Sequence, residues 1–243
     1  MFKNKVVVVT GGTSGIGYGI AKGFLQEGAK VFALYKNDDK KANKAVKELS
    51  KIGGFSAHKV DITDENQVAK FFSGLKSCDI LINCAGISNE DYIEKLTLEQ
   101  IKETLDVNLM GRIICCRQAL PLLKKSKYPS VINIASRFAE RPLATCIPYC
   151  VSEAATVMLS KNLALEWAPY KIRVNTISPS LTKTPLTMKL YTPEEMEETA
   201  KKNPSGRLGQ IDDVVQAVLF LSSEKASYIN GENLNVNGGI LLV

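Results

Sequence analysis

The sequence predicts a single α/β domain over residues 1–243, in which a doubly wound parallel sheet carries helices on both faces. Two observations carry this prediction. Near the N-terminus a short β-branched run leads into a glycine-rich turn and a helix, and further along the chain strand-like and helix-like segments alternate. Such alternation favours parallel strands joined by right-handed crossovers. Of the 243 residues 45% are hydrophobic and 23% are charged, as in an ordinary globular domain.

The first element is the strand Lys5–Thr10, which ends in the turn Gly11-Gly12-Thr13-Ser14-Gly15-Ile16-Gly17. Glycines there allow a tight turn and let a pyrophosphate approach the N-terminus of the next helix, where free N–H groups and the helix dipole favour anions. The order of strand, turn and helix is typical of a Rossmann-type nucleotide site. The spacing is Thr-Gly-x-x-x-Gly-x-Gly rather than G-x-G-x-x-G, and a glycine-rich hairpin turn is the alternative.

The remaining elements follow the same alternation. Apolar and β-branched runs predict strands, whereas a period of about 3.6 residues predicts helices. Strands are expected at 30–35, 55–60, 80–83, 131–135, 172–177 and 234–236; helices are expected after the first turn, up to about residue 51, at 64–75, 97–125, 149–167 and 214–221, and from Thr192.

Composition excludes several classes of function. Six cysteines without a C-x-x-C pair and a single histidine, His58, predict neither a disulfide framework nor a metal site. The net charge of +6 is spread along the chain, its densest clusters at 40–47 and 124–127 are typical of solvated helix faces, and no motif supports nucleic-acid binding. Because the early apolar run 6–9 is short and no stretch approaches the roughly 20 apolar residues that cross a bilayer, we expect a cytoplasmic protein without a membrane partner.

Several motifs resemble those of the short-chain dehydrogenase/reductase family. They are the N-terminal turn, the segments Asn83-Cys84-Ala85-Gly86 and Asn175-x-x-x-Pro179, and Ser136 and Tyr149 at a separation of 13 residues. The closing segments 206–209 and 235–239 are most similar to those of 3-oxoacyl-carrier-protein reductases. The resemblance runs from about Lys5 to Gly239, and it implies an oxidoreductase that interconverts a carbonyl and an alcohol with a nicotinamide dinucleotide.

The resemblance also implies roles for individual residues. Asp61 matches an acid that hydrogen-bonds adenine, and Asn108 matches an asparagine that holds a relay water. Ser136 and Tyr149 match the catalytic serine and tyrosine, and Glu153 stands where the family has a catalytic lysine. The implied cofactor contacts are Gly11, Thr13, Ser14, Gly15, Ile16, Gly17, Tyr35, Lys36, Asp61, Ile62, Asn83, Ala85, Gly86, Tyr149, Pro179, Leu181 and Thr184.

The residue types at 136 and 149 suit this chemistry. Hydride transfer to a carbonyl creates negative charge on its oxygen, so one group must hydrogen-bond that oxygen and a second must deliver a proton. A serine hydroxyl and a tyrosine phenol supply these functions. Either residue alone would more often satisfy nearby backbone at a strand end or a helix start, and their joint occurrence favours the catalytic interpretation.

Glu153 is the main departure from the family. A tyrosine has a pKa of about 10, so an adjacent cation that stabilises phenolate helps wherever phenolate is needed near neutrality. A carboxylate about 4 Å away would instead repel phenolate by about 4 kcal/mol at an effective dielectric near about 20, so the Tyr149 phenol is expected to stay neutral. If only the cation is missing, Glu153→Lys should raise turnover.

Three outcomes are compatible with a glutamate at this position. In the first, Glu153 accepts hydrogen bonds from ribose hydroxyls and passes protons through water, which leaves a slower reductase with an altered proton relay. In the second, another cation replaces the lysine: Arg137 and Arg141 follow Ser136 closely, whereas Lys161, about 12 Å further along the helix axis, is too far for direct contact. In the third, the chain binds nucleotide without useful turnover, as a subunit or regulatory partner of an active homologue.

Cofactor preference depends on the end of the second strand. NAD-specific folds place a carboxylate there, about 20 residues past the glycines, which accepts a hydrogen bond from the ribose 2′-hydroxyl. Here the segment is Tyr35-Lys36-Asn37, in which Lys36 can pair with a 2′-phosphate. NADP(H) is therefore favoured over NAD(H).

The segment 181–207 is expected to form a mobile lid over the substrate. Its path should differ from that in the family, because Ser180 replaces a glycine after Pro179 and serine resists positive φ. Met188, Leu190 and Tyr191 are candidates for a partly apolar pocket, which would suit a small-molecule carbonyl or alcohol such as a 3-oxoacyl thioester, a polyketide, a sugar or a steroid-like compound.

Self-association to a dimer or tetramer is predicted from apolar side chains near 108–123 and 149–167, among them Ile113, Cys116, Leu120, Val157, Leu163 and Trp167.

Overall fold

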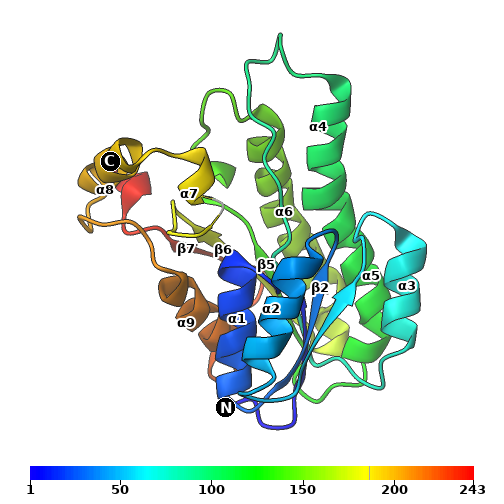
Figure 1. Ribbon diagram of the computed structural model, residues 1–243. Coiled ribbons are helices and arrows are strands. Elements are labelled where there is room, and N and C mark those ends of the chain that lie inside the picture. Colours follow the sequence, from blue (N-terminus) through cyan, green and yellow to red (C-terminus); the bar gives the residue numbers. More distant parts are fainter. Residues whose placement is uncertain (186) are drawn as a thin grey trace.

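A computed structural model describes residues 1–185 and 187–243, and it has the predicted architecture (Figure 1). In this part of the chain the strands form one parallel sheet in the order β3-β2-β1-β4-β5-β6-β7. The order reverses between β1 and β4, as it does in doubly wound sheets that bind dinucleotides. The strands are β1 (Val6–Thr10), β2 (Lys30–Tyr35), β3 (Phe55–Lys59), β4 (Ile80–Asn83), β5 (Ser130–Ile134), β6 (Arg173–Pro179) and β7 (Asn233–Val236).

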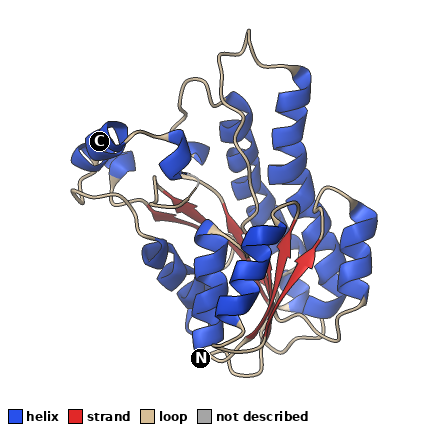
Figure 2. Cartoon of the chain, in the orientation of Figure 1, coloured by secondary structure: helices blue, strands red, loops and turns tan. Residues whose placement is uncertain are grey.

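Helices cover both faces of the sheet, so the strands lie enclosed in Figure 2. Helices α1, α2 and α9 pack on one face and α3, α5 and α6 on the other, each group over its own buried apolar cluster. The helices are α1 (Gly15–Gln26), α2 (Asp39–Leu49), α3 (Glu65–Ser73), α4 (Leu98–Leu105), α5 (Gly111–Leu123), α6 (Ile147–Glu166), α7 (Thr187–Leu190), α8 (Pro193–Lys202) and α9 (Ile211–Ser222).

Alternation along β1 shows why the sheet is buried on both sides. Val7 and Val9 belong to the cluster under α1, whereas Val8 belongs to the cluster under α5, and all three are fully buried. A parallel strand covered on both faces needs such a continuous apolar run. The β-branched sequence of β1 therefore fixes its place in the middle of the sheet.

The predicted helix 97–125 is interrupted in the structure. It begins at a capping box in which Thr97 and Gln100 exchange hydrogen bonds with each other's backbone, but between α4 and α5 the residues Asp106–Met110 form a π-helical turn. Such a wide turn accommodates an extra residue and is frequent at functional sites. Because it lies directly before α5, it sets which residues of α5 face the sheet.

The lid segment carries α7 and α8, which lie on the left of Figure 1 beside the C-terminus. Ser180 does not take a positive φ, in agreement with the expectation for serine, and its N–H donates to the Val236 carbonyl at 3.2 Å. The helix start predicted at Thr192 is confirmed, since Thr192 and Glu195 form a capping box. The side chain of Leu190 lies outside the described residues.

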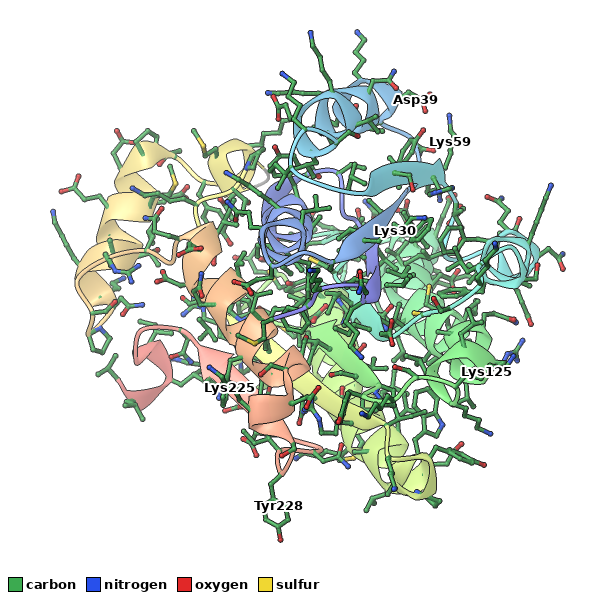
Figure 3. The ribbon with its side chains drawn as sticks, turned by 90° about the horizontal axis from the view of Figure 1, so that it is seen from below. Lys30, Asp39, Lys59, Lys125, Lys225 and Tyr228 are labelled. Carbon is green, nitrogen blue, oxygen red and sulfur yellow. The ribbon has the colours of Figure 1, made fainter. Side chains whose placement is uncertain are left out.

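Among the described residues, charged side chains lie at the surface or are partly exposed, except for those of Arg112 and Glu153, which are buried. In Figure 3 the labelled lysines Lys30, Lys59, Lys125 and Lys225 lie at different places on the surface, so the positive charge is not gathered in one patch there. Within 1–185 and 187–243, the helices include none long and apolar enough to cross a membrane. The same residues hold no cluster of three or more metal-ligating side chains.

Candidate active site

A cavity of about 690 Å³ opens at the carboxyl ends of the strands, between the turn after β1, the ends of β2 to β6 and the lid. This is where doubly wound sheets bind ligands, and the volume lies in the range of about 300–1,000 Å³ typical of ligand sites. The structure brings most of the predicted site residues together on its wall: Gly11, Ser14, Gly15, Ile16, Gly17, Tyr35, Lys36, Asp61, Ile62, Ala85, Gly86, Ser136, Tyr149, Glu153, Pro179, Leu181 and Thr184.

The glycine turn after β1 is shaped to present the N-terminus of α1. Gly11 and Gly15 have φ values of +66° and +55°, which L side chains rarely adopt, and a Cβ on Gly17 would lie 2.3 Å from the Gly11 carbonyl oxygen. Ser14 is the N-cap of α1 but makes no capping hydrogen bond with its side chain. Free backbone N–H groups and a free hydroxyl at a helix N-terminus suit a phosphate, so these residues fit the pyrophosphate of a dinucleotide.

Lys36 and Asp61 close the far end of the cavity. The Lys36 amine lies 2.7 Å from the Asp61 carboxylate, which also accepts from the backbone and the hydroxyl of Thr63. Burial alone would raise the pKa of Asp61, but the hydrogen bonds from Lys36 and Thr63 hold it below its usual range. Asp61 therefore stays ionised. Lys36 is half exposed, so its amine can also reach a ligand at the cavity edge.

Three predicted residues do not line the cavity: Thr13, Asn83 and Asn108. Asn83 bridges β4 to β5 through its hydrogen bond to the Asn133 side chain at 2.8 Å. Asn108 binds the backbone N–H and C=O of Ile87 at 2.9 Å each and donates to the Ser152 hydroxyl. Asn83 therefore holds the sheet, and Asn108 holds the π-helical turn against the loop after β4 and against α6.

Ser136 and Tyr149 meet in the cavity although they come from separate elements. Ser136 lies two residues after the end of β5 and caps a short turn, accepting from the Phe138 N–H at 3.3 Å. Tyr149 lies in the first turn of α6, and its ring meets the Phe138 ring edge-on at 6.3 Å between centroids. A hydroxyl and a phenol are thus both available to one ligand oxygen.

Glu153 points into the same region, and its partner is Arg112 of α5. The guanidinium binds both carboxylate oxygens, at 3.1 and 3.2 Å, and the two side chains are 3% and 1% exposed. The cation beside Glu153 is thus none of the three candidates considered from the sequence, and one of them, Arg141, instead donates to the carbonyls of Ile240 and Val243. Sequence reasoning missed Arg112 because it lies 41 residues from Glu153, although an arginine in an otherwise apolar helix stretch is a signal.

The electrostatics of the site keep the phenol neutral. Burial raises the pKa of Tyr149 above its usual value and the Glu153 carboxylate raises it further, whereas the Ser136 hydroxyl and Arg112 act in the opposite direction. Burial also raises the pKa of Glu153, against the attraction of Arg112. The prediction that Tyr149 stays protonated near neutrality agrees with these shifts.

The fold and the cavity define a class of protein, an α/β oxidoreductase of the dinucleotide-binding type. Residues 11–241 match the model of a family described as "Enoyl-(Acyl carrier protein) reductase". The chain belongs to the short-chain dehydrogenase/reductase family, and it is accordingly an enzyme that acts on CH–OH groups with NAD(P).

Relatives and solved structures cover nearly the whole chain. A 3β-hydroxysteroid dehydrogenase of Eggerthella lenta is 35% identical, with 99% of this chain and 95% of the relative aligned. An NAD-dependent glycerol dehydrogenase of Listeria innocua is 36% identical over 97% of this chain and 93% of its own length. The aldohexose dehydrogenase of Thermoplasma acidophilum has a similar structure, with a TM-score of 0.91 at 30% identity over 100% of this chain and 96% of that one.

Proposed function

We propose that this protein is an NADP(H)-dependent reductase that converts a small-molecule carbonyl to an alcohol. The observation that carries the proposal is the joint presence of Ser136 and Tyr149 on the wall of the cavity whose other end is formed by the glycine turn. A dinucleotide laid from that turn towards α6 would bring its reactive end to these two hydroxyl groups.

The residues divide the chemistry between them. A bound nicotinamide supplies the hydride that is added to the carbonyl carbon. Ser136 donates a hydrogen bond to the carbonyl oxygen, on which negative charge develops. Tyr149 delivers its phenolic proton to that oxygen, so that hydride and proton together yield the alcohol, and the phenolate regains a proton from water.

Lys36 supports a preference for NADP(H). Its amine lies at the end of β2, where NAD-specific folds carry an acid, and exchange of its partner Asp61 for a 2′-phosphate would retain its charge pairing. Asp61 is then free to accept from adenine. The Listeria innocua relative is named NAD-dependent, so the preference is a property to be tested on this chain.

The substrate end of the cavity is lined by Phe138, Leu143 and Tyr191, with Arg137 and Glu90 nearby. This mixture of apolar and charged groups suits an extended carbonyl compound with polar substituents. A 3-oxoacyl thioester, the substrate class suggested by the closing segments of the sequence, is one candidate. The steroid and polyol dehydrogenases among the relatives add hydroxysteroids and sugar alcohols.

The alternative role as a silent nucleotide-binding subunit rests on the missing lysine. It is disfavoured because Glu153 is neutralised by Arg112 and because a proton donor needs only a neutral phenol. We also propose that the protein forms a dimer or tetramer and that it is cytoplasmic.

The direct test is hydride transfer with the purified protein. NADPH consumption would be followed against a panel comprising a 3-oxoacyl thioester, a 3-ketosteroid and ketoses, with Tyr149→Phe as the matched inactive protein. We expect turnover of at least one class that is lost in the variant. Nucleotide binding without turnover of any carbonyl or alcohol would establish the silent subunit instead.

A further inference from the structure

The buried ion pair between Arg112 and Glu153 joins α5 to α6 at the wall of the cavity. Arg112 also donates to the Thr156 hydroxyl, and its second terminal nitrogen lies close to Gly86, 3.6 Å from where a Cβ would be. Its Nε has no hydrogen-bond partner among the described residues. The guanidinium is therefore held by contacts from three directions and still presents an unused donor.

Burial makes the two charges depend on each other. A carboxylate or a guanidinium removed from water is costly unless an opposite charge with good hydrogen-bond geometry compensates it. Here the geometry is bidentate, which is the strongest arrangement for an arginine and a carboxylate. The pair therefore behaves as one unit with no net charge.

The groups that act on Tyr149 come from four segments. Glu153 lies one turn further along α6, Arg112 faces it from α5, Ser136 adjoins it after β5, and Tyr191 approaches from the lid. Among these, Glu153 and Arg112 carry the opposing full charges. Loss of either charge alone would leave the phenol beside an unbalanced ion.

We propose that Arg112 is a positioning residue, which fixes the Glu153 carboxylate at the cavity wall and cancels its charge beside Tyr149, so that the phenol adjoins a neutral ion pair rather than an unpaired carboxylate. This inference rests on the proposed function, because it assigns the Arg112–Glu153 pair a role in that reaction. The charge cancellation itself is measurable without turnover, by titration of the phenol.

The experiment compares four forms of the full chain: the parent, Glu153→Gln, Arg112→Gln and the double variant. Tyr149 is titrated by ultraviolet difference spectroscopy, with Tyr149→Phe in each background as the blank, while circular dichroism reports the folded state. In Glu153→Gln the uncompensated Arg112 should lower the Tyr149 titration by about one pH unit or more. Adding Arg112→Gln should remove that shift.

A merely structural ion pair gives a different pattern. Such a pair predicts lower melting temperatures for both single variants. It does not predict a shift in the Tyr149 titration that appears in Glu153→Gln and disappears when Arg112→Gln is added. Arg117→Gln is the matched control, because Arg117 lies on the same helix in an exposed pair with Glu65 and should leave the titration unchanged. If Arg112→Gln does not fold, Arg112→Lys, which keeps the positive charge, should titrate as the parent does.

The proposal is overturned if Glu153→Gln leaves the titration of Tyr149 where it is, or if the double variant keeps the lowered value. Failure of the proposed function is separate, since it would appear as absent turnover in the parent with the titrations as expected. The alkaline limb of the pH profile for alcohol oxidation supplies a second readout, which should move with the titration in Glu153→Gln.

Discussion

At the scale of single residues, the buried carboxylate beside Tyr149 is firmly held in place. Glu153 is bound through both oxygens, and its burial is possible only because Arg112 approaches from another helix. The consequence for substitution is direct. A replacement of Glu153 therefore changes how the charge of Arg112 is compensated, as well as the surroundings of Tyr149.

Glu153→Lys should destabilise the protein, in contrast to the gain in turnover expected from the sequence alone. Two buried cations would face each other, and breaking a buried pair costs about 3–5 kcal/mol. Thermal unfolding should show a fall of about 10 °C for a chain of this size. Arg112→Met together with Glu153→Lys should restore part of the loss, because it removes the repulsion but leaves the lysine unpaired. Equal melting temperatures for the single and the double variant would contradict this account.

The pH dependence should differ between the two directions of the reaction. Because burial and Glu153 raise the pKa of Tyr149 above 10.0, the neutral phenol predominates throughout the range below it. Carbonyl reduction uses this form, so its rate should not fall through loss of the phenolic proton below that pH. Alcohol oxidation needs phenolate and should rise about tenfold per pH unit without a plateau. A plateau in the oxidation profile near neutrality, absent from Tyr149→Phe, would show a lowered pKa instead.

Cofactor preference should respond to Lys36. Lys36→Asp removes the cation available to a 2′-phosphate and offers a carboxylate to a 2′-hydroxyl, so the ratio of dissociation constants for NADPH and NADH should swing towards NADH by tenfold or more, about 1.4 kcal/mol. Lys59→Asp is the control, because Lys59 pairs with Asp39 on the outside of the sheet edge. An unchanged ratio would remove Lys36 from cofactor selection.

At the scale of elements, the strands and most helices were predictable because their patterns are local. The predicted strand 30–35 coincides with β2, and the other strands agree within one or two residues. The π-helical turn 106–110 was not predictable, since its sequence continues the helical pattern on both sides. The role of Arg112 was not predictable for a related reason, because a contact between α5 and α6 depends on how the two helices cross.

The glycine turn should tolerate no side chain at Gly17. Gly17→Ala would put a Cβ 2.3 Å from the Gly11 carbonyl oxygen, so the turn must open, at a cost of about 1–3 kcal/mol. We expect a lower melting temperature and weaker binding of NADPH by fluorescence titration. Gly74→Ala is the matched control, because its nearest contact would be an ordinary 3.5 Å. Equal behaviour of the two variants would mean that the turn is not rigid.

At the scale of the whole molecule, α6 presents apolar side chains that the fold leaves uncovered. Val151, Met158 and Leu165 recur every seven residues and are 55%, 56% and 78% exposed. Of the residues expected to drive association, five line a groove between α5 and α6, namely Ile113, Cys116, Leu120, Leu163 and Trp167. Cys116 and Trp167 are buried there, and Val157 is half-buried. The exposed stripe of α6 and this groove together form the surface that favours association.

We therefore expect a dimer or tetramer by light scattering at micromolar concentration, in which α6 faces its copy. Leu165→Glu should shift the protein to a smaller species, because charges would face each other across a two-fold axis. Tyr228→Glu is the control, since Tyr228 projects away from the body in Figure 3. A monomeric parent, or dissociation by both substitutions alike, would contradict the predicted interface.

The ion pair between Arg112 and Glu153 also has a consequence for the history of such a chain. No single substitution creates such a pair: Arg112 beside a lysine at 153 would leave two like charges in the interior, and either Arg112 or Glu153 without the other would leave one unpaired charge. Such a charge costs about 3–5 kcal/mol, a large share of the roughly 5–15 kcal/mol that stabilises a typical protein. An uncharged side chain at 153 avoids the two like charges, but whichever of the two charges is acquired next is unpaired until the other follows. The two positions are thus expected to be inherited together.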